Sequence, residues 1–179
     1  EFFKDLKVRG FHGSNVTLGI MDGLPGLETV FKEEFPQAKT QRCTVHVTRN
    51  VQAKVPKKFK DEVASDLRSI FYAPSKQKAY ERFDAFRNRW EKTLPSAVGC
   101  LERSIDSCLT FFSFPEEEWI SLRTTNIIER LNKEFRRRTR PMEILAGETA
   151  CYRILAFIAI KMELHWRSNP VGKVRRNLP

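Results

Sequence analysis

Residues 16–48 limit the possible folds more than any other part of the sequence. The apolar run at 16–21, bounded by turn residues, predicts a buried strand. A short helix follows, with its apolar residues on one face: Leu27, Val30, Phe31 and Phe35. Residues 38–48 then alternate as in a second strand, with Cys43, Val45 and Val47 on one side. A strand, a helix and a strand in this order predict a βαβ unit with parallel strands.

The next part of the chain, residues 51–118, has no strand pattern. Apolar residues recur there at helical spacing in three groups. These groups are Val63, Leu67, Ile70 and Phe71; Ala79, Phe83, Phe86 and Trp90; and Val98, Leu101, Ile105, Cys108, Leu109 and Phe112. We therefore expect three helices that form an all-helical subdomain inserted after the second strand.

The predicted fold class is α/β, with four segments. Residues 1–50 hold the strand–helix–strand core, preceded by a helix that Gly10 ends, and residues 51–118 form the helical insertion. Residues 119–166 return to the core through a basic helix and a final helix, and residues 167–179 form a basic tail. The final helix is predicted from an apolar stripe: Ile154, Leu155, Ile158, Met162 and Trp166.

The basic helix, residues 121–140, carries half of the net charge of the chain. It has seven basic and two acidic residues, a net charge of +5 against +10 for the whole chain. Thr124 or Thr125 can cap its start. Its basic residues are Arg123, Arg130, Lys133, Arg136, Arg137, Arg138 and Arg140, and its apolar residues, which can dock on a core, are Ile127, Ile128, Leu131 and Phe135. The run at 136–138 fits a solvated face or phosphate contacts. Phosphate is favoured because no acid follows Glu134 in this helix.

Two acids have positions that suit metal-dependent chemistry. Asp22 lies at the carboxyl end of the first predicted strand, where open α/β sheets place their sites. Glu129 lies on the basic helix. Carboxylates that converge from different elements can hold Mg²⁺, and phosphoryl transfer commonly uses two such ions. The alternative remains open that Asp22 caps a turn and Glu129 pairs with a neighbouring arginine.

Cys43 and His46 form a C-x-x-H pair, but the sequence alone argues against a zinc site. Zinc needs three or four ligands, no second pair stands at ligand spacing, and residues i and i+3 of a strand face opposite sides. A packed Cys43 and a hydrogen-bonding His46 are the favoured interpretation.

The four cysteines are irregularly spaced and fit a reducing cytoplasm, and no apolar run is long enough to predict a membrane span. Trp119 can stack on an unpaired base or fill the core, and the core is favoured.

Four motifs together resemble the Mutator-type transposases, a family that includes many bacterial insertion-sequence enzymes. They are D-G-x-x-G-L from Asp22, F-P-x-A-x-x-Q-R-C-x-V-H-x-x-R-N from Phe35 to Asn50, F-x-F-P-x-x-x-W from Phe112 to Trp119, and R-T-T-N-x-x-E-R-L-N-x-E-x-R-R-R-T from Arg123 to Thr139. They occur in the family order and cover nearly the whole chain.

The resemblance implies an RNase H-like catalytic domain with an Asp-Asp-Glu triad that binds Mg²⁺ or Mn²⁺. Asp22 is similar to the second acid and Glu129 to the third, while Cys43 and His46 match the C-x-x-H signature of the family. Trp119 resembles a tryptophan associated with flipped DNA at the cut end. The implied activity is DNA cleavage and strand transfer at insertion-sequence ends. The expected DNA contacts are Trp119, Arg123, Asn126, Arg130, Lys133, Arg136, Arg137, Arg138 and Arg140.

One departure from the family limits the expected activity. The first catalytic Asp belongs on a strand upstream of this unit, and the acids before Asp22 are Glu1 and Asp5, which lie in a helix-like segment. We therefore expect the carboxyl-terminal part of a transposase, with an incomplete active site. The intact parent is expected to be a homo-oligomer in the bacterial cytoplasm, associated with the nucleoid. The alternative hypothesis is a non-catalytic DNA-binding module that uses the basic helix and tail on double-stranded DNA.

Overall fold

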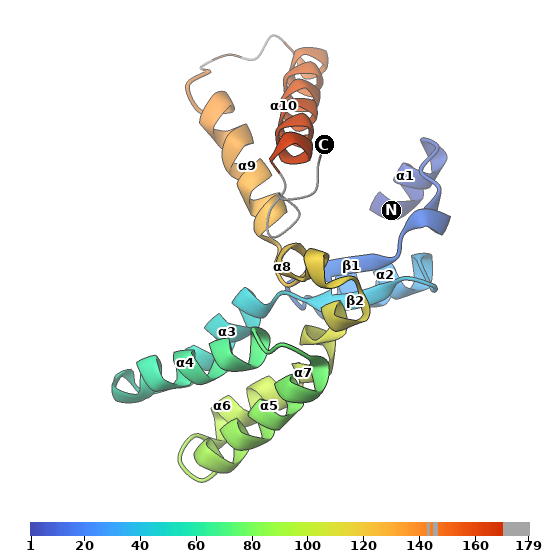
Figure 1. Cartoon of the computed structure of the whole chain (residues 1–179). Helices are drawn as coiled ribbons and strands as arrows, with labels where there is room; N and C mark the ends of the chain where they lie inside the picture. The colour runs from blue at the N-terminus through green and yellow to red at the C-terminus, as the bar shows by residue number, and fades with distance from the viewer. Residues whose placement is uncertain (143, 145–146, 170–179) are drawn as a thin grey trace. The chain divides into compact units, whose positions relative to one another are not determined.

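The computed structural model describes residues 1–142, 144 and 147–169. The chain divides between Thr124 and Thr125 into two compact units, each described by itself below. The first unit contains a small sheet and several helices, and the described part of the second contains helices α9 and α10 (Figure 1). The predicted domain limits at residues 50 and 118 remain predictions. Most of the predicted basic tail, residues 170–179, lies outside the described residues.

The sheet confirms the α/β fold class. Strands β1 (Leu18–Met21) and β2 (Lys39–Arg42) pair in parallel (Figure 1). Their register places Met21 opposite Arg42. Helix α2 (Pro25–Glu34) connects them, as the crossover of a parallel pair requires. Met21, Phe31 and Phe35 form a small apolar cluster. Phe3 of α1 (Phe2–Val8) packs against it, and its ring meets that of Phe35 edge to face, with the ring centroids 5.2 Å apart.

The prediction of a strand across residues 38–48 is wrong beyond Arg42. Strand β2 ends there, Cys43 takes the N-cap position, and α3 (Thr44–Gln52) begins. The β-branched residues of this stretch alternate as they would in a strand, but Val47 and Val51 belong to the helical core. Packing at helical spacing therefore outweighs local strand preference, which depends strongly on context.

Residues 51–118, all of which the structure describes, contain helices and no strand. Their core includes buried Val63, Leu67, Ile70, Phe83 and Trp90. The helices are α4 (Lys60–Phe71), α5 (Lys76–Trp90), α6 (Pro95–Glu102) and α7 (Ile105–Cys108), with short 3-10 helices at Lys57–Phe59, Thr110–Ser113 and Glu116–Glu118.

The third predicted helix is broken rather than continuous, and Gln41 explains part of the break. The fully buried Gln41 side chain reaches from β2 into this region. Its Nε2 donates to the Cys108 carbonyl oxygen at 2.8 Å, and its Oε1 accepts from the Phe111 N–H at 2.8 Å. In a continuous helix both groups would bond to backbone four residues away. Gln41 takes over these bonds and joins the helical region to the sheet.

The second unit is a pair of helices that lie side by side, α9 (Asn126–Thr139) and α10 (Glu148–Ser168) (Figure 1). Ile158 of α10 is buried, whereas α9 has no buried residue. Ile127 and Ile128 are largely exposed, so the apolar face predicted for α9 is only partly covered. Thr125 occupies the N-cap position, one of the two predicted for it.

Candidate functional site

Asp22 stands directly after β1, at the carboxyl end of the strand. The next residue, Gly23, has φ of +94°, a backbone conformation that favours glycine. A Cβ atom at Gly23 would lie 2.8 Å from the guanidinium carbon of Arg42. Arg42 donates to the Ser104 hydroxyl at 2.8 Å and to the Gly23 carbonyl oxygen at 3.4 Å. The turn that carries Asp22 is thus fixed by its own backbone and by the neighbouring strand.

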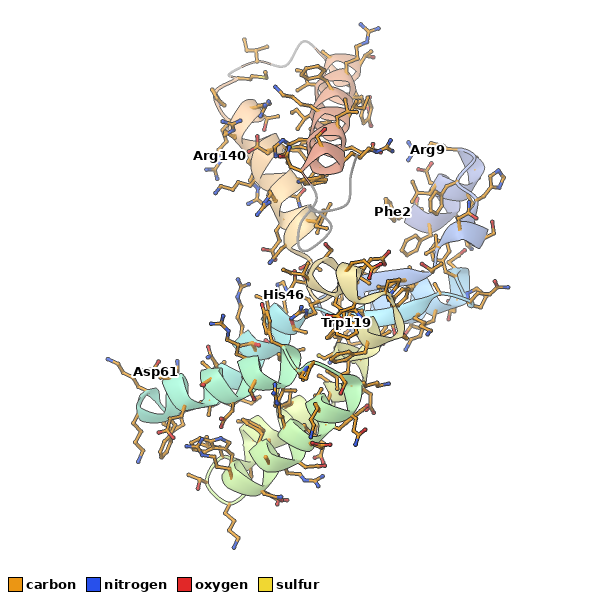
Figure 2. All side chains as sticks on the ribbon, viewed as in Figure 1. Phe2, Arg9, His46, Asp61, Trp119 and Arg140 are labelled. Carbon is orange, nitrogen blue, oxygen red and sulfur yellow. The ribbon has the colours of Figure 1, made fainter. Side chains whose placement is uncertain are left out.

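Cys43 and His46 lie beside Asp22. The Cys43 N–H donates to the Met21 carbonyl oxygen at 2.9 Å, which continues the ladder and places Cys43 next to Asp22. His46 lies near the start of α3 (Figure 2), with its Nδ1 3.1 Å from Asp22 Oδ1. The Asp22 side chain is 57% exposed and that of His46 is 25% exposed, whereas Cys43 is buried. An accessible carboxylate therefore lies beside a thiol and an imidazole.

Trp119 and Arg123 contact the helical core. Trp119 (Figure 2) is the first residue of α8 (Trp119–Leu122). Its indole Nε1 donates to the Phe114 carbonyl oxygen at 2.8 Å. The Arg123 guanidinium lies 4.3 Å from the Tyr72 ring centroid and donates to the Phe71 carbonyl oxygen at 3.2 Å. Burial lowers the pKa of Arg123. These contacts are structural, and DNA contacts by either side chain stay predictions.

Glu129 lies in the first turn of α9, where its carboxylate accepts a hydrogen bond from the Thr125 hydroxyl at 3.4 Å. Asn126 is the first residue of this helix. Six predicted DNA contacts on α9 and at its end are exposed: Asn126, Arg130, Lys133, Arg136, Arg137 and Arg140. Glu129 therefore stands among basic side chains at the amino-terminal end of α9.

Glu134 neutralises part of the arginine run. Its Oε2 accepts from Arg138 at 2.7 Å and from Arg137 at 3.0 Å. These hydrogen bonds, with that from Arg138 the stronger, hold the pKa of Glu134 below its ordinary value. The prediction of phosphate contacts by residues 136–138 depended on the lack of acids after Glu134. The i, i+3 and i, i+4 spacing of Glu134 to these arginines was the signal for the pairing.

A groove between α9 and α10 gathers further basic residues. Its volume is about 380 Å³. It is lined by Arg130, Glu134, Arg137, Arg138, Ile158, Lys161, Met162, His165 and Trp166. Lys161 and His165 were not predicted as binding residues, because the sequence gives the apolar stripe of α10 without its partner helix. The groove combines cationic groups with the aromatic surface of Trp166, which suits a polyanion that carries flat rings.

The chain thus combines a parallel α/β unit, with an exposed acid at a strand end, and a strongly basic helix. The sequence profile described as "Transposase, Mutator family" matches residues 1–169, and the chain belongs to this family.

Individual relatives agree with the profile. The transposase for insertion sequence element ISRM5 of Rhizobium meliloti (strain 1021) is 32% identical over 166 residues, which cover 93% of this chain and 41% of that protein. The transposase for IS406 of Burkholderia multivorans is 34% identical over 178 residues, 99% of this chain and 45% of that protein. The chain thus spans less than half the length of these relatives. Among its described helices, none is both long and apolar enough to cross a bilayer.

Proposed function

We propose that this chain provides part of a DDE-type transposase catalytic domain, which cuts DNA at insertion-sequence ends and joins it to a target. Membership of the Mutator family supports the activity. The observation that carries the proposal is the position of Asp22, exposed at the carboxyl end of β1 and held by Gly23 and Arg42. In this proposal the parallel pair belongs to an RNase H-like core, and Asp22 and Glu129 are the second and third acids of the triad.

The donor atoms of these two acids fit Mg²⁺ or Mn²⁺. Both ions prefer hard oxygen ligands, and Mg²⁺ usually keeps several water molecules. The Asp22 carboxylate has room for a hydrated ion because more than half of its side-chain surface is exposed. When bound, such ions activate the attacking oxygen and stabilise the leaving oxygen in phosphoryl transfer. Asp22 and Glu129 would hold them, while the basic residues of α9 and the groove would orient the DNA backbone.

The substrate in this proposal is double-stranded DNA, both the transposon ends and the target. Arg130 and Lys161 line the groove and suit phosphate groups. The intact protein would act as a homo-oligomer in the cytoplasm, associated with the nucleoid. A second candidate, a non-catalytic DNA-binding module, is favoured by the basic residues that line the groove. It would use the same groove and basic helix without holding metal.

Metal binding separates the two candidates. We expect Mn²⁺ to bind the chain, and we expect Asp22→Asn and Glu129→Gln each to weaken binding by more than about tenfold, because each removes a ligand. Isothermal titration gives the affinity, and paramagnetic broadening of NMR signals locates the ion. Asp61→Asn, at an exposed acid of α4, is the matched control and should change nothing. Binding that survives both ligand substitutions would favour the non-catalytic module.

The same proposal predicts no strand transfer by the 179-residue chain alone, since Asp22 and Glu129 supply two of the three acids. The assay mixes the chain, Mg²⁺ or Mn²⁺ and labelled insertion-sequence-end DNA, and separates the products by gel electrophoresis. The intact ISRM5 transposase acting on its own ends is the positive control. Turnover that Glu129→Gln abolishes would contradict the prediction, because it would require a complete catalytic site within this chain.

A further inference from the structure

Three potential metal ligands of different chemistry meet at the carboxyl edge of the sheet. Asp22, Cys43 and His46 each offer one ligand atom, and these atoms all lie within 4.8 Å of one another. In the part of the chain that the structure describes, this is the one such group of three or more. It combines an oxygen, a sulfur and a nitrogen donor.

The chain builds this cluster from the register of two strands and one turn of helix. Met21 pairs with Arg42, so the residues that follow them, Asp22 and Cys43, are neighbours at the sheet edge. Helix α3 starts at Thr44, which places His46 three residues after Cys43 on the same side of the first turn. In a strand Cys43 and His46 would face opposite sides, but this stretch is the start of a helix, so both can face Asp22.

The donor set selects a class of metal ion. Thiolate and imidazole suit Zn²⁺ and similar borderline ions, whereas Mg²⁺ prefers oxygen alone. Three protein ligands with a fourth position open to solvent are typical of zinc sites that bind water or substrate. The amino-terminal end of a helix also favours negative charge, and Cys43 is the N-cap residue of α3.

We propose that Cys43 Sγ, His46 Nδ1 and the Asp22 carboxylate form a site for one divalent cation of the zinc class. All three ligands belong to the first unit, so the site requires neither Glu129 nor bound DNA. It shares Asp22 with the magnesium site proposed above, so the two ions compete for this carboxylate. Zinc at this site would therefore oppose magnesium binding, and the C-x-x-H pair would act as a metal-dependent switch on Asp22.

Cobalt provides the direct test, because Co²⁺ replaces Zn²⁺ and gives a near-ultraviolet charge-transfer band when a thiolate binds it. We expect the chain to bind one equivalent of Co²⁺ with such a band, and one equivalent of Zn²⁺ to abolish the band by displacement. Cys43→Ser should remove the band. The matched control is Cys100→Ser, a cysteine outside the cluster, which should keep it. Circular dichroism establishes that both variants are folded.

A second substitution tests the same site in case the Cys43 variant does not fold. His46→Asn keeps the thiol and should weaken Co²⁺ binding by more than about tenfold, since losing even an outer-shell partner has that effect. A wild-type chain without the charge-transfer band, or a band that persists in Cys43→Ser, would overturn the proposal. It would leave His46 as a hydrogen-bonding neighbour of Asp22. The cobalt titration is repeated on Glu129→Gln. An unchanged band would show that this site forms without Glu129, whether or not the catalytic proposal holds.

Discussion

Replacing Gln41 with methionine is expected to lower the free energy of unfolding by about 2–6 kcal/mol. The Gln41 side chain is fully buried, and its amide satisfies the Cys108 carbonyl and the Phe111 N–H. Methionine has a similar shape but no hydrogen-bonding amide, so both backbone groups would be buried without partners, at about 1–3 kcal/mol each. Because domains are only marginally stable, this change would remove a large share of the total free energy of unfolding. Urea unfolding followed by tryptophan fluorescence measures the change.

The control is Gln77→Met, because Gln77 lies on the exposed face of α5 and donates to Glu81, another exposed side chain. Its effect should stay within about 0.5 kcal/mol, as is usual for surface substitutions. Equal stability of the two variants would show that the Cys108 and Phe111 backbone groups find other partners. Gln41→Glu offers a further comparison. It keeps an acceptor for Phe111 but loses the donor to Cys108, and it adds a buried charge, so it should cost at least as much.

The sequence predicted β1 and α2 because their apolar residues follow one period without conflict. It failed at residues 43–48, where the alternation of Val45 and Val47 suits a strand and the packing of Val47 and Val51 suits a helix. The deciding contacts come from residues far along the chain, which local pattern does not contain. The same error separated Cys43 from His46, so the three-ligand cluster could not be foreseen.

Long-range partners also explain what was missed elsewhere. The bonds of Gln41 to residues 108 and 111 depend on how the helical region folds back, which the local strand pattern does not contain. Lys161 and His165 join the groove only because α10 lies beside α9. In contrast, the pairing of Glu134 with Arg137 and Arg138 is local, and helical spacing alone would have indicated it.

The groove between α9 and α10 gives the second large expected effect, on DNA affinity. Replacing both Arg130 and Lys161 with glutamate should weaken binding of duplex DNA roughly a hundredfold at about 0.1 M salt. Each phosphate contact adds about 0.9 to the steepness with which log K falls as log salt rises. Lowering the salt concentration from about 1 M to about 0.1 M therefore raises the affinity by about a factor of ten for each contact. The slope itself should fall by about two. Fluorescence anisotropy over a range of salt concentrations measures both quantities.

Two further variants separate a groove effect from net charge and from misfolding. Lys57→Glu with Lys58→Glu makes the same change of net charge at exposed residues outside the groove, and should reduce affinity much less. Glu134→Gln should act in the opposite direction. It releases Arg137 and Arg138 from the carboxylate that now accepts their hydrogen bonds, so DNA should bind more tightly. An unfolded protein would not gain affinity in this way. If Glu134→Gln weakened binding, Glu134 would instead be holding its two arginines in the orientation that phosphate needs.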